Sequence, residues 1–320
     1  MAGNNLLAVE DLRVRFDTGR GQVVAVDGVD FSLEKAQTLG IVGESGCGKS
    51  VTGLSIMGLL SNNARTSGKI IFEGDNLLEK NEKQMSRIRG NRISMIFQEP
   101  MTSLNPVFTI QNQLDEVFRK HKGMRSNEIV NKTIDALHLV GIPNPERRMK
   151  DYPHNLSGGM RQRIMIAMAL ACNPDILIAD EPTTALDVTI QAQILVLIRK
   201  LQEDLKTGVI MITHDLGVVA QVAHKVAVMY AGQVVEYASV EDLFSEPLHP
   251  YTRGLLRTIP GVARSKAKLE EIEGTVPALS SLPGGCRFHP RCRDRIARCS
   301  SEIPEMLNMQ GRSVRCWLCA

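Results

Sequence analysis

The stretch TLGIVGESGCGKS (residues 38–50) decides the fold of this 320-residue chain. It joins a short apolar run to a loop of the form G-x-x-x-x-G-K-S, and the helical stretch VTGLSIMGLL (51–60) follows. Glycines let backbone N–H groups close around phosphates, and a helix N-terminus adds partial positive charge. A chance glycine-rich turn is the alternative. The flanking strand and helix favour a site for nucleotide phosphates.

The residue types in this loop predict separate roles. Lys49 is expected to reach the β- and γ-phosphates, and the Ser50 hydroxyl is expected to ligate Mg²⁺. Cys47 stands at a variable position, where a small residue suffices. The expected nucleotide-binding set runs from the loop into the first helical turn: Gly43, Glu44, Ser45, Gly46, Cys47, Gly48, Lys49, Ser50 and Val51.

Length and composition indicate a globular protein with one large domain and a smaller one. Hydrophobic residues make up 43% of the chain and charged residues 23%, both ordinary values. The formal net charge of +3 is too small and too dispersed for a nucleic-acid binder, so no nucleic-acid partner is expected. The charge is uneven, because residues 285–320 hold seven arginines against three acidic residues.

The N-terminal sequence MAGNNLLAVEDLRVRF (1–16) lacks the basic and apolar regions of a signal peptide. The most apolar stretches have about half the length that a membrane span needs. We therefore expect a cytosolic chain whose membrane association is peripheral, at the cytoplasmic face and through a partner. In a reducing cytosol its seven cysteines are better explained as metal ligands or buried apolar residues than as disulfides.

Short apolar runs alternate with helical stretches, which predicts an α/β fold with right-handed crossovers. The runs lack polar alternation, as is typical of strands buried on both faces of a parallel sheet. They are residues 38–43, 92–98, 175–180 and 208–214. The clearest helix covers 188–205, with an expected buried face of Ile190, Ile194, Leu197, Leu201 and Leu205.

Other regions depart from that alternation. Residues 6–34 and 68–73 indicate an antiparallel patch, and 107–172 reads as a mainly helical insertion. After Phe244 the pattern gives way to Pro, Gly, charged residues and Cys. We therefore predict a large domain over 1–244 and an accessory domain over 245–320.

The run DILIADEP (175–182) ends a predicted strand in two acidic residues. Neighbouring strand residues point to opposite faces, so the two carboxylates can act differently. We assign Asp180 to Mg²⁺, through water, and Glu181 to polarising the attacking water. A solvated acidic turn is the alternative.

The segment LSGGMRQR (156–163) precedes an apolar helical run. Ser157 is the expected cap, and Gly158 and Gly159 leave the helix N-terminus bare, so it can bind an anion. One nucleotide does not need two such ends in one subunit. Two head-to-tail copies would each offer this end to the other's γ-phosphate. An ordinary helix cap is the alternative.

Gln98 and His214 each end a predicted strand, as do the phosphate loop and Asp180. Ligands of open α/β sheets bind outside the carboxyl ends of the strands, so four polar features are expected to converge there. His214 could bond the γ-phosphate and orient Glu181, while Gln98 could contact Mg²⁺ and the attacking water. Structural roles for the two side chains are the alternative.

Together these motifs resemble the ATP-binding subunit of an ABC transporter over nearly the whole chain. The resemblance implies an ATP hydrolase that uses ATP and Mg²⁺. It also implies a P-loop core sheet, an antiparallel β subdomain and a helical subdomain. The loop matches Walker A, LSGGM the signature, ILIADE Walker B, and Ala185-Leu186-Asp187 the D-loop. Phe16 stands where the family places an aromatic on adenine; a core aromatic is the alternative.

SLNP (103–106) and LHPYT (248–252), with the cysteines that follow, resemble the oligopeptide/dipeptide import branch. That resemblance implies a second, related ATPase in a heterodimer, two transmembrane permeases and an extracytoplasmic peptide-binding protein. It also implies coupling helices of the permeases seated on the helical insertion and around Gln98–Pro106. Close relatives serve nickel, glutathione and other peptide-like solutes, so the cargo stays open.

The C-terminal tail has the spacing Cys286-x5-Cys292-x6-Cys299-x16-Cys316, with Cys319 two residues beyond. Four thiolates without a histidine suit an iron–sulfur cluster, whose negative charge the arginines would offset. Branch members with this pattern resemble cluster binders, which implies a [4Fe-4S] cluster on Cys286, Cys292, Cys299 and Cys316. Zinc, free thiols, and Cys319 as the fourth ligand are the alternatives.

Two other functions fit parts of the sequence. One is an ABC-type ATPase acting on DNA or ribosomes, but such relatives usually carry coiled-coil or zinc insertions, or two cassettes. This sequence has one cassette and no heptad arm. The other is a redox-sensing regulatory ATPase, in which the cysteine tail would matter more than transport.

Overall fold

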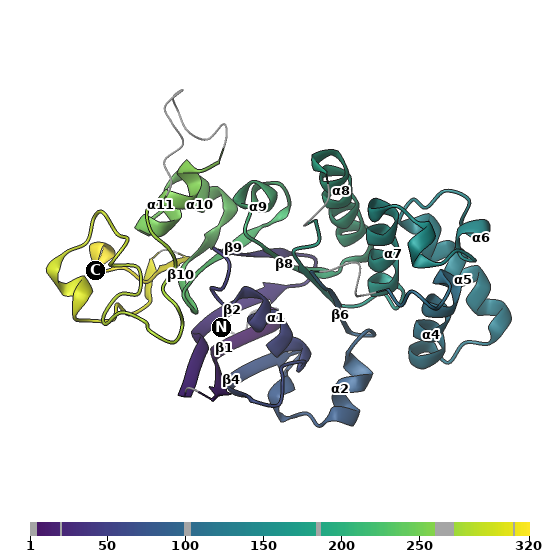
Figure 1. The fold of residues 1–320 in the computed structure, drawn as a ribbon, viewed down its shortest axis with the longest axis horizontal. Helices are drawn as coiled ribbons and strands as arrows, with labels where there is room; N and C mark the ends of the chain where they lie inside the picture. The colour runs from purple at the N-terminus through teal and green to yellow at the C-terminus, as the bar shows by residue number, and fades with distance from the viewer. Residues whose placement is uncertain (1–4, 20, 99–103, 184–186, 260–271, 310) are drawn as a thin grey trace. The chain divides into compact units, whose positions relative to one another are not determined.

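The computed structural model describes residues 5–19, 21–98, 104–183, 187–259, 272–309 and 311–320. The chain divides into two compact units (Figure 1). The first unit contains residues 1–34, 38–79 and 211–320, and the second contains 35–37 and 80–210. In the part of the chain that the structure describes, no helix combines the length and the apolar character of a membrane span.

An antiparallel sheet occupies the N-terminal part of the first unit. Its order is β2-β1-β4-β5. The register between Val9 and Leu12 shifts at a bulge where Asp11 has φ 44°, so both apolar residues are buried although they lie three positions apart. The predicted antiparallel patch is confirmed. The strands are β1 (Asn5–Thr18), β2 (Gly21–Glu34), β4 (Ala64–Phe72) and β5 (Asp75–Asn76).

The phosphate loop of the first unit follows a second, mixed sheet. β3 (Thr38–Val42) is buried along its whole length and pairs in parallel with β9 (Lys225–Tyr230). β10 (Gln233–Ser239) continues the sheet antiparallel to β9. No strand is predicted over 225–239, and the structure has a hairpin there, whose turn residues Ala231 and Gly232 both have positive φ.

The C-terminal residues extend this mixed sheet. β12 (Arg312–Val314) pairs with β10, and β11 (Leu307–Met309) pairs with β12. The sequence pattern after Phe244 does not reveal these short strands. The helical elements of this unit are α1 (Lys49–Met57), η1 (Leu77–Glu79), α9 (Leu216–Val222), α10 (Val240–Ser245), α11 (Pro250–Arg257), η3 (Ala297–Ser300) and η4 (Trp317–Cys319).

The second unit holds the parallel pair β6 (Ile93–Ile96) and β7 (Ile176–Asp180). β8 (Gly208–Thr213) runs from this unit into the first one, and all six of its residues are buried. In the described part of 107–172 the regular elements are helical. The helical elements of the unit are α2 (Glu82–Ile88), α4 (Ile110–Lys122), α5 (Ser126–Leu139), α6 (Pro145–Arg148), η2 (Pro153–Asn155), α7 (Gly158–Leu170) and α8 (Val188–Leu205).

Helix α8 has the predicted bounds, but the predicted buried face is partly wrong. Ile194 and Leu201 are buried as expected. Ile190, Leu197 and Leu205 are only partly buried, and the rest of the buried face is Leu195, Ile198 and Gln202. Apolar residues surround much of this helix, so the sequence period alone leaves the rotation of the buried face ambiguous.

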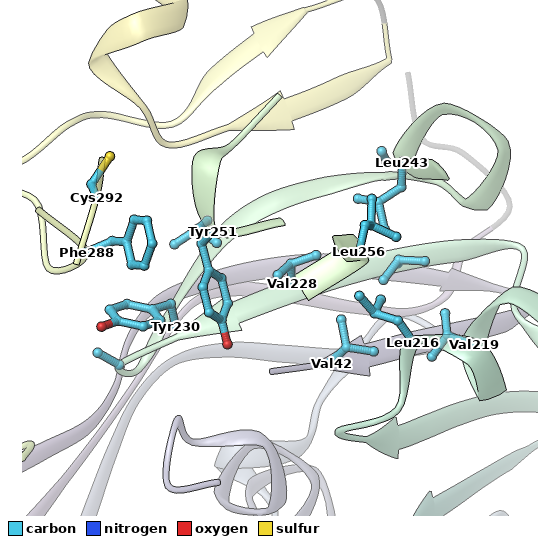
Figure 2. Packing of buried hydrophobic residues seen from close by; sticks show 14 residues of the cluster. Val42, Leu216, Val219, Val228, Tyr230, Leu243, Tyr251, Leu256, Phe288 and Cys292 are labelled. Carbon is cyan, nitrogen blue, oxygen red and sulfur yellow. The ribbon is translucent and has the colours of Figure 1, made fainter. Parts of the chain in front are cut away.

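A buried aromatic cluster attaches the C-terminal segment to β9 and β10 (Figure 2). Tyr251 of α11 packs on Tyr230 of β9, with ring centroids 4.7 Å apart, and Phe288 packs on both rings. The Glu236 carboxylate, 1% exposed, accepts the N–H groups of Leu248 and His249 at 2.8 and 2.9 Å. Such a carboxylate satisfies two backbone donors that would otherwise be buried without a partner.

His249 is buried as a neutral ring at the start of α11. Its Nδ1 accepts the Tyr251 N–H at 3.0 Å, and the ring lies 5.7 Å from that of Phe288. Burial, reinforced by the positive charge of Arg253, lowers the pKa of His249 from 6.5 to about 3. Between these two pH values, His249 is therefore protonated in the unfolded chain and neutral in the folded chain.

Folding stability should consequently be full above pH 6.5 and fall as the pH decreases below that value. Between pH 7 and 5, His249 should contribute a loss of about 2 kcal/mol in the free energy of unfolding. Denaturant melts of the full chain at several pH values measure this. The variant His249→Asn keeps an acceptor for the Tyr251 N–H and should show a flatter pH dependence. Equal slopes for the two proteins would contradict the assignment.

Candidate nucleotide-binding site

The phosphate loop lies between β3 and α1 in the first unit, as the sequence predicts. Gly48 precedes α1 with φ 102°, a conformation that favours glycine. The Lys49 side chain is 5% exposed, and its ammonium donates to the carbonyl oxygens of Gly43 at 2.7 Å and Glu44 at 3.0 Å. Carbonyl oxygens of the loop itself therefore bind the Lys49 ammonium group.

Two glycines of the loop are required by close backbone contacts. A Cβ at Gly43, whose φ is +155°, would lie 2.2 Å from the carbonyl oxygen of Met229 in β9. A Cβ at Gly48 would lie 2.5 Å from the carbonyl oxygen of Ala25 in β2. Real Cβ atoms do not approach backbone so closely, so any side chain at either position must displace a strand or the loop.

The other loop residues differ in their exposure, and their predicted roles remain predictions. Ser45 and Gly46 are exposed, while Ser50 and Val51 are half-buried in the first turn of α1. Cys47 is fully buried, and this burial raises the pKa of its thiol. Its carbonyl oxygen accepts the Gly232 N–H at 2.9 Å. A buried neutral thiol agrees with the expectation of a small residue at this position.

The second unit brings two of the three predicted catalytic residues together. Asp180 ends β7 and is 4% exposed, whereas Glu181 is half-buried with φ 46°. The Gln98 amide Nε2 donates to Glu181 Oε2 at 2.9 Å. This bond connects the two side chains that follow the parallel strands β6 and β7.

The signature segment in the second unit has the predicted cap. The Ser157 hydroxyl accepts the Met160 N–H at 3.3 Å and begins α7. Asp187 caps α8 by accepting the Ile190 N–H at 3.0 Å, and a Cβ at Gly159 would lie 3.0 Å from the Ile190 side chain. These residues, with Gly158 and Arg163, line an open pocket of about 410 Å³. Ala185 and Leu186, the first two residues of the expected D-loop, lie outside the described residues.

Phe16 and His214 belong to the first unit. Phe16 is half-buried on β1, opposite Val23 of β2 and Ala64 of β4. His214 follows β8 and is exposed. Both side chains are therefore accessible, as the adenine-contact and catalytic predictions require, and both roles remain predictions.

Two residues without an expected role contact the phosphate loop. The Tyr251 hydroxyl accepts the Glu44 N–H, and the Arg291 guanidinium pairs with the Glu44 carboxylate. Tyr251 appears in the sequence only as part of the family marker LHPYT, and Arg291 as one of seven tail arginines. A contact over more than 200 positions leaves no local signal, so no pattern predicts it.

All seven cysteines are free thiols. Burial raises the pKa of Cys316 to about 12, and the charges of Cys319, Cys286 and Cys292 act in the same direction. Burial, with a smaller effect of the Cys299 charge, raises the pKa of Cys286. The Cys299 carbonyl oxygen accepts the Cys286 N–H at 2.9 Å. The four predicted thiols thus share one neighbourhood. Among the described residues, however, no group of three or more His, Cys, Asp or Glu side chains is arranged to hold a metal ion.

Comparisons with known proteins show that the chain resembles the ATP-binding cassettes of ABC transporters. The family model of the ABC transporter matches residues 26–184, which include the phosphate loop and the signature. The dimeric ATP-binding cassette MJ0796 in a post-hydrolysis state with ADP and Pi is 27% identical, with a TM-score of 0.65 over 73% of this chain and 98% of that one. The cassette cbiO1 of Clostridium perfringens gives the same TM-score and identity over 76% of this chain and 92% of its own.

Relatives with higher sequence identity indicate the branch of ABC transporters to which the chain is most similar. The oligopeptide/dipeptide transporter C-terminal region matches residues 235–299. The oligopeptide transport ATP-binding protein AppD of Bacillus subtilis is 52% identical over 98% of this chain and 97% of that protein. The dipeptide transport protein DppD of the same species is 53% identical over 98% and 94%. The oligopeptide transport protein OppD of Escherichia coli is 49% identical over 98% and 93%.

The chain belongs to the ATP-binding proteins of ABC transporters, in the branch with the oligopeptide/dipeptide C-terminal region. Proteins of this family are ATPases that power transport, and their activity requires ATP and Mg²⁺. The fold prediction is therefore confirmed for the nucleotide-binding domain.

Gly48→Ala tests whether the close contact between the loop and β2 shapes the nucleotide site. Gly48→Ala should weaken ATP binding at least about tenfold, since the new methyl must push the loop away from β2. Titration of the full chain with a fluorescent ATP analogue measures this. Gly74→Ala is the matched control, because Gly74 also has positive φ (+90°) but has open space around its Cβ position. Similar affinities for the two variants would show that the contact does not shape the site.

Proposed function

We propose that this chain hydrolyses ATP to power the import of oligopeptides or dipeptides through a pair of membrane permeases. The observation that carries the proposal is the match over nearly the full length to relatives whose names specify oligopeptide or dipeptide transport. The C-terminal region supports it, since its family model is specific to these transporters. A related solute such as nickel or glutathione is the alternative cargo for the same ATPase.

The proposed chemistry assigns each polar residue one task. Lys49 and the loop N–H groups bind the phosphates. The Ser50 hydroxyl, the Gln98 amide and, through water, the Asp180 carboxylate would hold Mg²⁺. Glu181 takes up a proton from the attacking water, and its bond from Gln98 keeps the carboxylate oriented for this. His214 contacts the γ-phosphate and Phe16 stacks on adenine. Mg²⁺ neutralises charge on the phosphates when it is bound.

We propose that the ATPase works as a head-to-tail pair with a second, related ATPase subunit. The Ser157, Gly158 and Gly159 end of α7 then completes the partner's site, with Asp187 beside it. The pocket of about 410 Å³ along these residues is consistent with this role. The pair would sit peripherally at the cytoplasmic face of the membrane, below two permeases that receive peptide from an extracytoplasmic binding protein. Residues 1–244 form the ATPase domain in this scheme, and residues 245–320 the accessory domain.

Glu181→Gln tests the catalytic assignment. The variant loses the carboxylate that accepts the proton, so we expect ATP to bind normally and hydrolysis to fall about 100-fold or more. Peptide-stimulated ATPase activity of the transporter reconstituted in vesicles measures the rate. Normal turnover would refute the role of Glu181. Stimulation by DNA, and none by peptide with permease, would refute the transport proposal itself.

We also propose that Cys286, Cys292, Cys299 and Cys316 bind a [4Fe-4S] cluster. The shared neighbourhood of the four thiols, the burial of three of them and the lack of disulfides fit such a ligand set. Against it stands the lack of a formed metal-binding group among the described residues, so the segment must rearrange locally to close around a cluster. Zinc on the same thiols is the alternative metal.

Iron analysis of the anaerobically purified full chain tests this proposal. We expect about four iron and four acid-labile sulfide per chain. Cys292→Ser should lose most of this iron, whereas Cys172→Ser, a buried thiol of the second unit, should keep it. Cys316→Ser and Cys319→Ser together decide the fourth ligand. Colourless protein without iron and sulfide would refute the cluster, and bound zinc would replace it.

A further inference from the structure

Glu44 of the phosphate loop is held at all three of its polar groups. Its N–H donates to the Tyr251 hydroxyl at 3.0 Å, and its carbonyl oxygen accepts from Lys49 at 3.0 Å. Its carboxylate accepts hydrogen bonds from both terminal nitrogens of Arg291, at 2.9 and 3.1 Å. Two of the three partners come from the C-terminal segment, more than 200 positions away, and the third is the lysine expected to bind phosphate.

Tyr251 is rigidly placed for this contact. It is fully buried at the start of α11, and its ring packs on Tyr230 and Phe288 (Figure 2). The Tyr251 N–H donates to the His249 ring, and the His249 N–H donates to the Glu236 carboxylate. Burial and the Glu44 charge raise the pKa of Tyr251, so the phenol stays neutral and its oxygen can accept the Glu44 N–H.

Arg291 is equally constrained. Its side chain is 6% exposed, and it also donates to the carbonyl oxygens of Ile272 and Glu273 at 3.2 and 3.0 Å. Its guanidinium carbon lies 5.8 Å from the centre of the Tyr230 ring. In this bidentate pair the arginine is buried and the carboxylate is 31% exposed, so its geometry is better defined than that of a fully exposed ion pair.

We propose that Tyr251 and Arg291 are positioning residues for ATP binding, which hold the start of the phosphate loop in shape while Lys49 changes partners. Lys49 donates to Gly43 and Glu44 inside the loop, and phosphates compete for the same ammonium protons. Once Lys49 turns to the phosphates, the Glu44 carbonyl oxygen loses the bond from Lys49 and keeps the weaker one from the Cys47 N–H, at 3.4 Å. The N–H and carboxylate of Glu44 then depend on Tyr251 and Arg291 alone.

The two residues touch the loop and not the reacting atoms, so they should affect ATP binding and not the chemical step. Because the contacts concern the loop alone, the proposal is independent of the cargo. It makes the C-terminal segment a structural part of the nucleotide site.

The test compares Tyr251→Phe and Arg291→Gln with two matched controls. Tyr237→Phe removes a phenol that bonds the Ser32 carbonyl oxygen, and Arg293→Gln removes an arginine that pairs with Glu273. Affinity of the full chain for trinitrophenyl-ATP is measured first. KM for MgATP and kcat are then measured in the assembled transporter.

We expect Tyr251→Phe and Arg291→Gln each to weaken nucleotide binding about threefold to tenfold, as for the loss of one net hydrogen bond. KM should rise by the same factor, with kcat at saturating ATP within about twofold of the parent. Arg291→Lys should restore part of the affinity. In a Glu44→Gln background, Arg291→Gln should have less effect than in the parent.

Unchanged affinity and KM in both variants would overturn the proposal. A fall in kcat alone, or a lower melting temperature with normal KM, would also overturn it, since either means that the residues do not position the loop for ATP. If Arg291→Gln does not fold, Tyr251→Phe still decides the question, because the phenylalanine ring preserves the packing on Tyr230 and Phe288.

Discussion

At Gly43 and Gly48 there is no room for a Cβ atom between the phosphate loop and the strands β9 and β2. The carbonyl oxygens of Met229 and Ala25 occupy the space that a Cβ at Gly43 or Gly48 would take. Contacts with β9 and β2 therefore determine the conformation of the loop, and α1 begins directly after Gly48. The β9–β10 turn completes the arrangement, because Gly232 donates to the Cys47 carbonyl oxygen and accepts the Asp27 N–H. Elements distant in the sequence thus determine the shape of the predicted phosphate loop.

Local patterns predict a large part of this structure. The strand before the loop, the helix after it, the Ser157 cap and the acidic end of β7 all follow from short-range rules of capping and burial. The strands β9 and β10, the rotation of α8 and the bonds from Tyr251 and Arg291 to Glu44 do not. Each depends on which distant segment lies alongside, and a single sequence does not specify that.

The arginines of the tail also have a clearer role in the structure than in the sequence. Counted as a surplus of positive charge, they suggest compensation for an anionic cluster. Five of the seven have a carboxylate partner: Arg287 with Asp27, Arg291 with Glu44, Arg293 with Glu273, Arg298 with Glu302 and Arg312 with Glu246. Two of those carboxylates, Asp27 and Glu44, belong to the N-terminal part of the first unit. Two of the tail arginines, Arg287 and Arg291, therefore attach the tail to β2 and to the phosphate loop.

The pairing of β12 with β10 has a consequence for solubility. A strand at the border of a sheet offers unpaired N–H and C=O groups to any other extended chain, and long apolar borders promote aggregation. β10 is mostly buried, β12 pairs with its residues Glu236 and Tyr237, and the outermost strand at this end of the order is the three-residue β11. A border that short, with Asn308 and Met309 exposed, gives a foreign strand little to pair with. At this end of the sheet, β11 and β12 thereby present a shorter border than the seven-residue β10 would offer.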